Sequence, residues 1–98
     1  KKVLKTVTKS FKSASGNILI EGHTDDLAIR TKKFPSNWEL SSARASSVAR
    51  YFGESGINQS RCMVIGKGEF DPLVPNTNKK NRAKNRRVKI IIKALTPS

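Results

Sequence analysis

The sequence predicts an α+β fold in which helices pack on one face of a small mixed sheet. Apolar residues recur at helical spacing in 3–14 and 37–55, whereas they alternate with period two in 87–94. Two short apolar runs, 17–22 and 61–65, indicate further strands. The resulting order, α-β-α-β-(α)-β, is typical of a two-layer domain, and 98 residues suffice for one such domain with a modest core.

The first helix is amphipathic and leads directly into a strand. Its apolar side is formed by Val3, Leu4, Val7, Phe11 and Ala14, and its lysines lie opposite. We expect this helix to end near Ser15-Gly16, because glycine is a natural C-terminal stop. The strand 17–22 ends in the polar sequence His23-Thr24-Asp25-Asp26.

The longest helix is expected over 37–55, after a charged loop at 27–36. Ser36 or Asn37 can cap its N-terminus, and Glu39 lies in its first turn, where an acidic side chain favours a helix. It is the strongest helical signal in the sequence.

The last third of the chain adds two strands and a short basic helix. The strand 61–65 leads into the turn Gly66-Lys67-Gly68, and 78–85 is expected to form the basic helix. In the final strand, 87–94, one face is buried, and that face is formed by Val88, Ile90, Ile92 and Ala94.

We expect residues 1–98 to form a single domain with a frayed tail at 95–98. The chain opens on Lys1 rather than Met, and three strands make a small sheet. We therefore expect a fragment of a larger protein, in which another strand precedes Lys1. No apolar run reaches the roughly 18–20 residues that a membrane span needs. The single Cys62 excludes an internal disulfide and an all-cysteine zinc site.

The net charge of +13 resides at the two ends of the chain. All seven acidic residues lie between 21 and 71, where seven Lys and Arg balance them. Five lysines lie at 1–12, and eight Lys or Arg lie at 79–93. Such flanks attract polyanions, whether nucleic acid, anionic lipid or an acidic wall polymer. The charge distribution alone leaves the class of partner open.

Arg44 occupies a helical position where an apolar residue is expected, between Leu40 and Val48 at i−4 and i+4. A guanidinium at a core boundary is costly unless an anion meets it. Arg44 is therefore either a snorkelling side chain paired with a structural carboxylate or a side chain held for an incoming carboxylate or phosphate, which its planar fork suits.

Asp25 is the natural companion of Arg44. It lies just beyond the carboxyl end of a buried strand, where α/β folds usually bind their ligands. It can equally serve as a loop cap or a helix N-cap. If both residues face one pocket, Arg44 can hold a carboxylate and Asp25 an ammonium group, so that together they grip a zwitterion.

Four motifs follow one another along the chain. They are Gly22-His23-Thr24-Asp25, Asn37-Trp38-Glu39-Leu40-Ser41-Ser42-Ala43-Arg44-Ala45, Gly66-Lys67-Gly68-Glu69 with Pro72 and Asn76, and Asn85-Arg86-Arg87-Val88. From about Ile18 to Ile92 the chain resembles the OmpA-like peptidoglycan-binding domain. The long spacer before the second motif, with Phe34-Pro35-Ser36, is most similar to that of the flagellar stator protein MotB and its relatives.

The resemblance implies a β/α/β/α/β fold that binds the peptide stem of peptidoglycan non-covalently, outside the cytoplasmic membrane. In the family, the residues at the positions of Asp25 and Arg44 grip diaminopimelate. The positions that line or support the pocket are Thr24, Asn37, Leu40, Arg86 and Arg87. We thus expect a periplasmic anchor domain without enzymatic activity, metal or cofactor, from a membrane-anchored homodimeric envelope protein such as a flagellar motor stator.

Other classes of site have weaker support. His23, Asp25 and Ser41 lack the Gly-x-Ser-x-Gly turn and the second base of a hydrolase, so the His23 ring is expected to hydrogen-bond locally. His23, Asp25 and Cys62 lack the spacing of metal ligands. The alternative function is a polyanion- or nucleic-acid-binding module that uses 79–93, although no aromatic residue is interleaved with its bases. Nucleic acid is therefore not the expected partner.

Overall fold

The computed structural model describes residues 2–13 and 15–93. Every predicted helix and strand is present, and its ends differ from the expected ones by no more than a residue. The elements are α1 (Lys2–Ser13), β1 (Asn17–Gly22), α2 (Asn37–Glu54), the 3₁₀ turn η1 (Gln59–Arg61), β2 (Cys62–Gly66), α3 (Lys79–Asn85) and β3 (Val88–Lys93). The positions expected for Ala14, Ala94 and the tail 95–98 lie outside the described residues. Within the described ranges, no helix combines the length and the apolar character needed to span a membrane.

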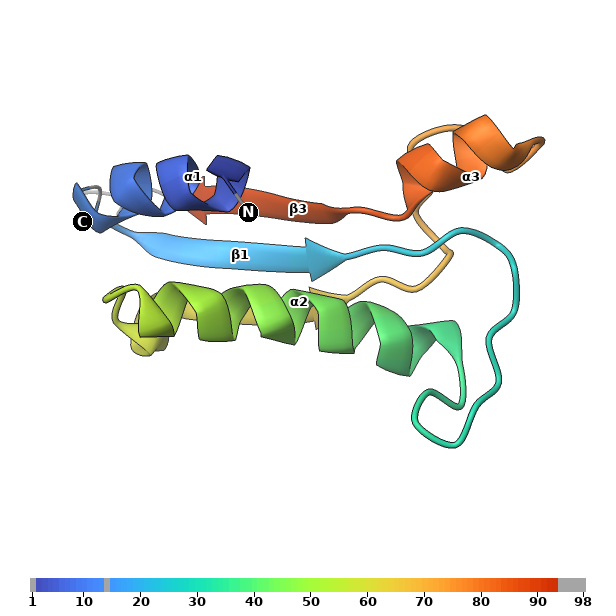
Figure 1. The fold of residues 1–98 in the computed structure, drawn as a ribbon, viewed down its shortest axis with the longest axis horizontal. Helices are drawn as coiled ribbons and strands as arrows, with labels where there is room; N and C mark the ends of the chain where they lie inside the picture. The colour runs from blue at the N-terminus through green and yellow to red at the C-terminus, as the bar shows by residue number, and fades with distance from the viewer. Residues whose placement is uncertain (1, 14, 94–98) are drawn as a thin grey trace.

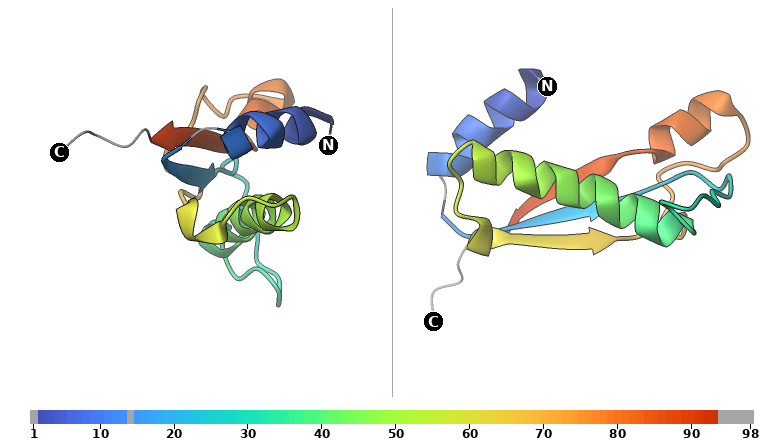
Figure 2. Two further views of the ribbon diagram at one scale, coloured as in Figure 1. Left: turned by 90° about the vertical axis from the view of Figure 1, so that its left-hand side faces the viewer. Right: turned by 60° about the horizontal axis from the view of Figure 1, so that its bottom comes forward.

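The described strands form a mixed sheet in the order β2-β1-β3. β1 runs parallel to β2 and antiparallel to β3, so that Ile20 at its centre pairs with Val64 on one side and Ile90 on the other. α1 and α2 lie on the same face of this sheet (Figure 1; Figure 2, left). The predicted α+β fold, with helices on one face of a small mixed sheet, is therefore confirmed.

The hydrophobic core lies between this sheet and the helices. Ile18 and Ile20 of β1 and Phe52 of α2 are fully buried. Phe11 of α1 packs edge-on against Phe52, with the ring centroids 5.7 Å apart. Both helices thus remove apolar surface from water against one cluster of side chains, which is the main favourable term in folding.

Arg61, expected to be the first residue of a strand, instead ends the turn η1. Its guanidinium reaches back to the C-terminal end of α1, where Nε donates to the carbonyl of Gly16 at 2.7 Å and Nη1 to that of Phe11 at 3.0 Å. A cation at a helix C-terminus satisfies carbonyls that the helix leaves without a partner. Arg61 therefore ties α1 to the start of β2, and the strand begins one residue later.

α2 begins with a capping box. Ser36 is the N-cap residue: its hydroxyl accepts a hydrogen bond from the Trp38 N–H and donates one to the Glu39 carboxylate. The hydroxyl of Ser36 thereby lowers the pKa of the Glu39 carboxyl. Of the two expected caps the structure selects Ser36, which leaves the side chain of Asn37 for contacts with the neighbouring loop.

The buried stripe of α2 contains two polar residues. It is formed by Asn37, Ser41, Ala45 and Phe52. Trp38 lies off this stripe, is half exposed and stacks on Phe70 with the ring centroids 5.0 Å apart. Arg44 is partly buried beside the stripe, at the core boundary that the sequence indicated.

Two glycines allow α2 to approach the sheet closely. Gly22 at the end of β1 and Gly66 at the end of β2 are partners in the sheet register. A Cβ atom on Gly22 would lie 1.9 Å from the Ser41 carbonyl oxygen, and one on Gly66 would lie 2.0 Å from the Ser42 hydroxyl oxygen. Non-bonded heavy atoms do not come this close in a packed interior. Only glycine therefore permits the observed spacing between α2 and this end of the sheet.

Replacing Gly22 by alanine should destabilise the domain. The new methyl group meets backbone atoms, so α2 has to shift, and we expect the free energy of unfolding to fall by about 1–3 kcal/mol. Gly53→Ala is the matched control, because its Cβ meets the exposed side chain of Gln59 and alanine favours a helix by about 0.5–1 kcal/mol. Urea denaturation compares the two variants, and equal stabilities would contradict the close-approach argument.

Candidate functional site

Three chain segments meet at the carboxyl end of β1. The backbone N–H of His23 donates to the carbonyl of Arg87 at 2.9 Å, and that of Thr24 donates to the carbonyl of Gly68 at 2.9 Å. The loop after β1 is thus bonded both to the turn after β2 and to the segment before β3. These two backbone hydrogen bonds fix the position of the residues that immediately precede Asp25.

Asp25 is buried, and both oxygens of its carboxylate accept hydrogen bonds. Oδ2 accepts from Nη1 of Arg86 at 2.7 Å, which forms an ion pair, and Oδ1 accepts from the backbone N–H of Leu27 at 3.0 Å. The Thr24 hydroxyl donates to the Asp25 carbonyl at 2.9 Å. Asp25 therefore does cap its own loop, as one of the two sequence interpretations required, and it also faces Arg86.

Asn37 holds this loop against the start of α2. Its side-chain Nδ2 donates to the carbonyl of Leu27 at 3.2 Å, to the carboxylate of Glu69 at 3.4 Å and, at 3.5 Å, to the carbonyl of Asp25. Because these partners lie in two different loops, Asn37 joins the helix to both. It is placed as a support behind Asp25.

Asn85 plays the corresponding role on the other side of Arg86 and was not singled out in the sequence as a site residue. It is fully buried. Its Oδ1 accepts from the backbone N–H groups of Leu73 and Val74 at 2.8 and 3.1 Å, and its Nδ2 donates to the Val74 carbonyl and to Asn76 Oδ1 at 2.8 and 2.7 Å. One side chain thus anchors the loop before α3 to the residue that precedes Arg86.

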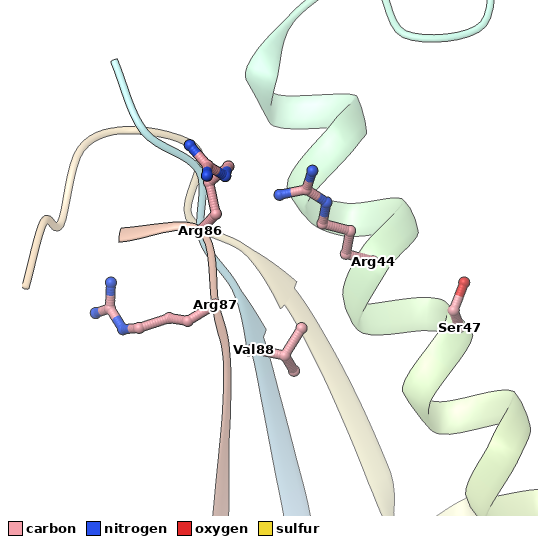
Figure 3. Close-up of a pocket in the computed structure, with 5 residues that line it drawn as sticks. All are labelled: Arg44, Ser47, Arg86, Arg87 and Val88. Atoms are coloured by element: carbon pink, nitrogen blue, oxygen red, sulfur yellow. The ribbon is translucent and has the colours of Figure 1, made fainter. Parts of the chain in front are cut away.

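Arg44 and Arg86 project into a common groove between α2 and the start of β3 (Figure 3). The groove has a volume of about 480 Å³ and is lined by Arg44, Ser47, Arg86, Arg87 and Val88. The guanidinium of Arg44 points from α2 toward Arg86, whereas that of Arg87 points away from α2 (Figure 3). Arg87 instead donates to the backbone carbonyls of Asp71 and Asn85 at 3.4 and 3.5 Å.

The side chain of Arg44 has no ion pair and no hydrogen bond within residues 2–13 and 15–93. Asp25, which the sequence predicted as the companion of Arg44, is paired with Arg86. The interpretation of Arg44 as the partner of a structural carboxylate therefore finds no carboxylate in this part of the chain. What remains is a partly desolvated guanidinium that faces an open groove, where a carboxylate or phosphate would be held by charge-assisted hydrogen bonds.

Leu40 and Arg44 also line a second hollow on the far side of Arg44. This hollow has a volume of about 350 Å³, and the residues around it are Lys33, Phe34, Leu40, Ala43, Arg44, Ser47 and Arg50. The structure thus brings Arg44 together with Arg86 and Arg87 in one hollow and with Leu40 in the other. Asp25 is joined to the first hollow by its ion pair with Arg86, and Thr24 and Asn37 donate to the backbone carbonyl of Asp25.

The residues considered for catalysis are buried and bonded. His23 is 1% exposed, and its Nε2 lies 3.3 Å from Oε1 of Glu21, which confirms the local hydrogen bond expected for its ring. Ser41 is fully buried, donates to the Trp38 carbonyl and accepts from the Gly68 N–H. A hydroxyl held in this way is not presented to a substrate.

Two of the three candidate metal ligands, His23 and Cys62, lie at opposite ends of the sheet. Cys62 pairs with Ile18 at the start of β1, whereas His23 follows the end of that strand. Burial raises the pKa of the Cys62 thiol, which favours the neutral form. Among the described residues, the group whose ligand atoms come within 4.8 Å of one another is Glu21, His23 and Asp71.

Known proteins resemble this chain in both sequence and structure. Residues 1–86 match the model of the OmpA family. Motility protein B of Bacillus subtilis is 38% identical over 77 residues, which cover 78% of this chain and 30% of that protein. A MotB-like protein from Desulfovibrio vulgaris is 41% identical with a TM-score of 0.88, over 97% of this chain and 62% of that one.

A second solved structure, the cell wall anchor of the T6SS from Pseudomonas aeruginosa, is 34% identical with a TM-score of 0.88, over 96% of this chain and 66% of that one. This chain therefore spans less than a third of the motility protein and about two thirds of each solved chain. The resemblances read from the four motifs are confirmed.

Asn85→Ala should weaken the domain more than any exposed change on the same helix. The substitution leaves the N–H groups of Leu73 and Val74 without the acceptor that the fully buried Asn85 side chain supplies, and we expect a loss of about 1–3 kcal/mol in the free energy of unfolding. Asn81→Ala is the control, because that side chain donates to the Thr77 hydroxyl in an exposed hydrogen bond. Thermal or urea unfolding measures both, and an Asn85→Ala variant as stable as the control would contradict the anchoring role.

Proposed function

The chain belongs to the OmpA family, and on that premise we propose that it binds the peptide stem of peptidoglycan without covalent attachment. The ligand group is the free end of diaminopimelate, where one carbon carries both a carboxylate and an ammonium group. The observation that carries this proposal is the guanidinium of Arg44, which has no ion pair among the described residues and points across a groove toward Arg86, the partner of Asp25.

In this proposal the carboxylate of the ligand lies between Arg44 and Arg86. Two guanidinium groups that face one groove with a single buried acid beside them leave an excess of positive charge, which an incoming carboxylate neutralises. Each charge-assisted hydrogen bond formed there contributes roughly 1.5–3 kcal/mol net when it is shielded from water. Arg86 is then shared, because it holds Asp25 through Nη1 and offers its remaining N–H groups to the ligand.

The ammonium group is assigned to Asp25. Its carboxylate accepts one hydrogen bond on each oxygen, from Arg86 and from Leu27, whereas a carboxylate has about four acceptor sites. Asp25 therefore keeps capacity for an ammonium donor while it remains paired. Thr24 and Asn37 act indirectly, by holding the backbone that presents Asp25.

The proposed role is that of a non-enzymatic anchor. Among the relatives, one is named as a motility protein and another as a cell wall anchor, which supports an anchoring role for this chain. We propose that the chain is the periplasmic domain of a membrane-anchored, homodimeric envelope protein that is part of a flagellar motor stator. Modest affinity at each site suffices there, because several anchors on one wall act together.

Removing either charge should abolish most of the binding. For Arg44→Gln and for Asp25→Asn we expect a loss of about 2–5 kcal/mol with a diaminopimelate-containing peptide, because the surviving charges are left unpaired in the groove. Lys84→Gln on α3 is the matched control, since it removes the same single charge from an exposed position outside the groove. Isothermal titration calorimetry measures all three, and unchanged affinity in Arg44→Gln would sink the assignment.

Co-sedimentation with purified sacculi tests the wall itself as the partner. We expect binding that persists at high salt and is lost in Arg44→Gln, because a buried, shaped contact is screened less than exposed charges. A DNA pull-down at the same salts is the comparison. Binding to both polymers that vanishes with salt and ignores Arg44 would identify a general polyanion binder that uses the basic segment 79–93 instead.

A further inference from the structure

The groove does not end at Arg44. The second hollow lies on the other side of that residue and shares Arg44 and Ser47 with the first. Its floor is one stripe of α2, because Leu40, Ala43, Ser47 and Arg50 recur at spacings of three and four residues. The loop before α2 closes its other side through Lys33 and Phe34. The two hollows therefore adjoin each other, with Arg44 and Ser47 as their shared wall.

This second hollow is rich in positive charge. Lys33, Arg44 and Arg50 all line it, and no acidic residue is among its lining residues. Within the part of the chain that the structure describes, Lys33 and Arg50 form no ion pair. Three cations around one hollow without a counter-charge repel one another, so the arrangement favours an anionic occupant.

Two of these cations are directed by neighbouring groups. Nη2 of Arg50 donates to the Ser47 hydroxyl at 3.0 Å, and that hydroxyl donates to the Ala43 carbonyl, so Arg50 is drawn toward the shared wall of the two hollows. The ammonium group of Lys33 lies 5.4 Å from the ring centroid of Phe34. Phe34 is held in turn by Thr31, whose hydroxyl accepts from its N–H at 2.9 Å.

We propose that the second hollow is an anion subsite that takes a second carboxylate of the same stem peptide. The inference rests on the proposed function, which assigns the first hollow to diaminopimelate. It implies that the chain prefers stem peptides that carry a second free carboxylate. Arg44 stands between the two subsites, Arg50 and Lys33 bind the second carboxylate, and Phe34 and Leu40 offer apolar surface to the peptide backbone between them.

The spacing suits a peptide of this size. Arg44 and Arg50 are six residues apart on α2, which corresponds to about 9 Å along the helix axis. An extended peptide covers about 3.3–3.6 Å per residue, so two or three residues reach from one subsite to the other. A single amino acid fills only the first hollow.

Two synthetic tripeptides separate the subsites. One is L-alanyl-γ-D-glutamyl-diaminopimelate, with a free carboxylate on its glutamyl residue, and the other carries a carboxamide there. Calorimetry on the wild-type chain should show tighter binding of the acidic peptide. In the Lys33→Gln/Arg50→Gln double variant we expect the acidic peptide to bind about 5- to 20-fold more weakly and the preference to disappear, as for two partly exposed charge pairs. Free diaminopimelate should bind both proteins equally.

Arg30→Gln/Lys32→Gln is the matched control, because it removes two exposed cations of the same loop that do not line the hollow. It should retain the preference for the acidic peptide. If the wild type binds both tripeptides equally while Arg44→Gln still abolishes binding, the second subsite is refuted and the proposed function stands. If Arg44→Gln has no effect on any ligand, the proposed function itself fails.

A third ligand distinguishes the source of the anion. Glycerol phosphate mimics the phosphodiesters of acidic wall polymers. One outcome is that glycerol phosphate binds through Lys33 and Arg50 while the two tripeptides bind equally well. In that case the hollow binds a phosphate polymer, and the carboxylate assignment is overturned. Weak glycerol phosphate binding beside a clear preference for the acidic tripeptide supports the assignment.

Discussion

The ion pair between Asp25 and Arg86 determines the character of the whole site. Oδ2 of the buried carboxylate accepts from Arg86 at 2.7 Å, and among the described residues no ion pair joins Asp25 to Arg44. A single buried acid thus stabilises one arginine and leaves the other facing an open groove. The same pair keeps the desolvated Asp25 charge from standing alone, which would cost several kcal/mol in the interior. The stability of the fold and the capacity of the groove to bind a ligand therefore both depend on the Asp25–Arg86 ion pair.

The packing at this end of the sheet positions the Asp25–Arg86 ion pair relative to α2. Gly22 and Gly66 let α2 approach the strand ends, which brings Arg44 opposite Arg86. The buried side chains of Asn37 and Asn85 then hydrogen-bond to the loops on either side. Such buried amides are stabilising only when all their partners are in place, so these loops are specified as a unit. The backbone around the groove is consequently preformed, and Arg86 is held in it by the Asp25 carboxylate.

The helices, the strands and two of the site residues could be predicted from the sequence, whereas the long-range contacts could not. Periodicity located every helix and strand, because the core faces of α2 and β3 repeat with the period of their element. Arg44 was found as a charge on a nearly apolar arc, and Asp25 by its place after a buried strand. The pairing of Asp25 with Arg86, 61 residues away, has no local signal. The same holds for Asn85, whose role depends on a loop that folds back over it, and for Lys33 and Arg50, which resemble ordinary solvated charges until the hollow between them is seen.

Side-chain NMR shows whether the guanidinium of Arg44 is held for a carboxylate. Nitrogen-15 spectra of the arginine Nε–H groups are recorded while free diaminopimelate is added. We expect the Arg44 and Arg86 signals to move together and to saturate at one ligand per chain, because both guanidiniums bind the same carboxylate. If the Arg44 signal stays fixed while those of Arg82 and other flanking cations drift without saturation, the groove is not the binding site.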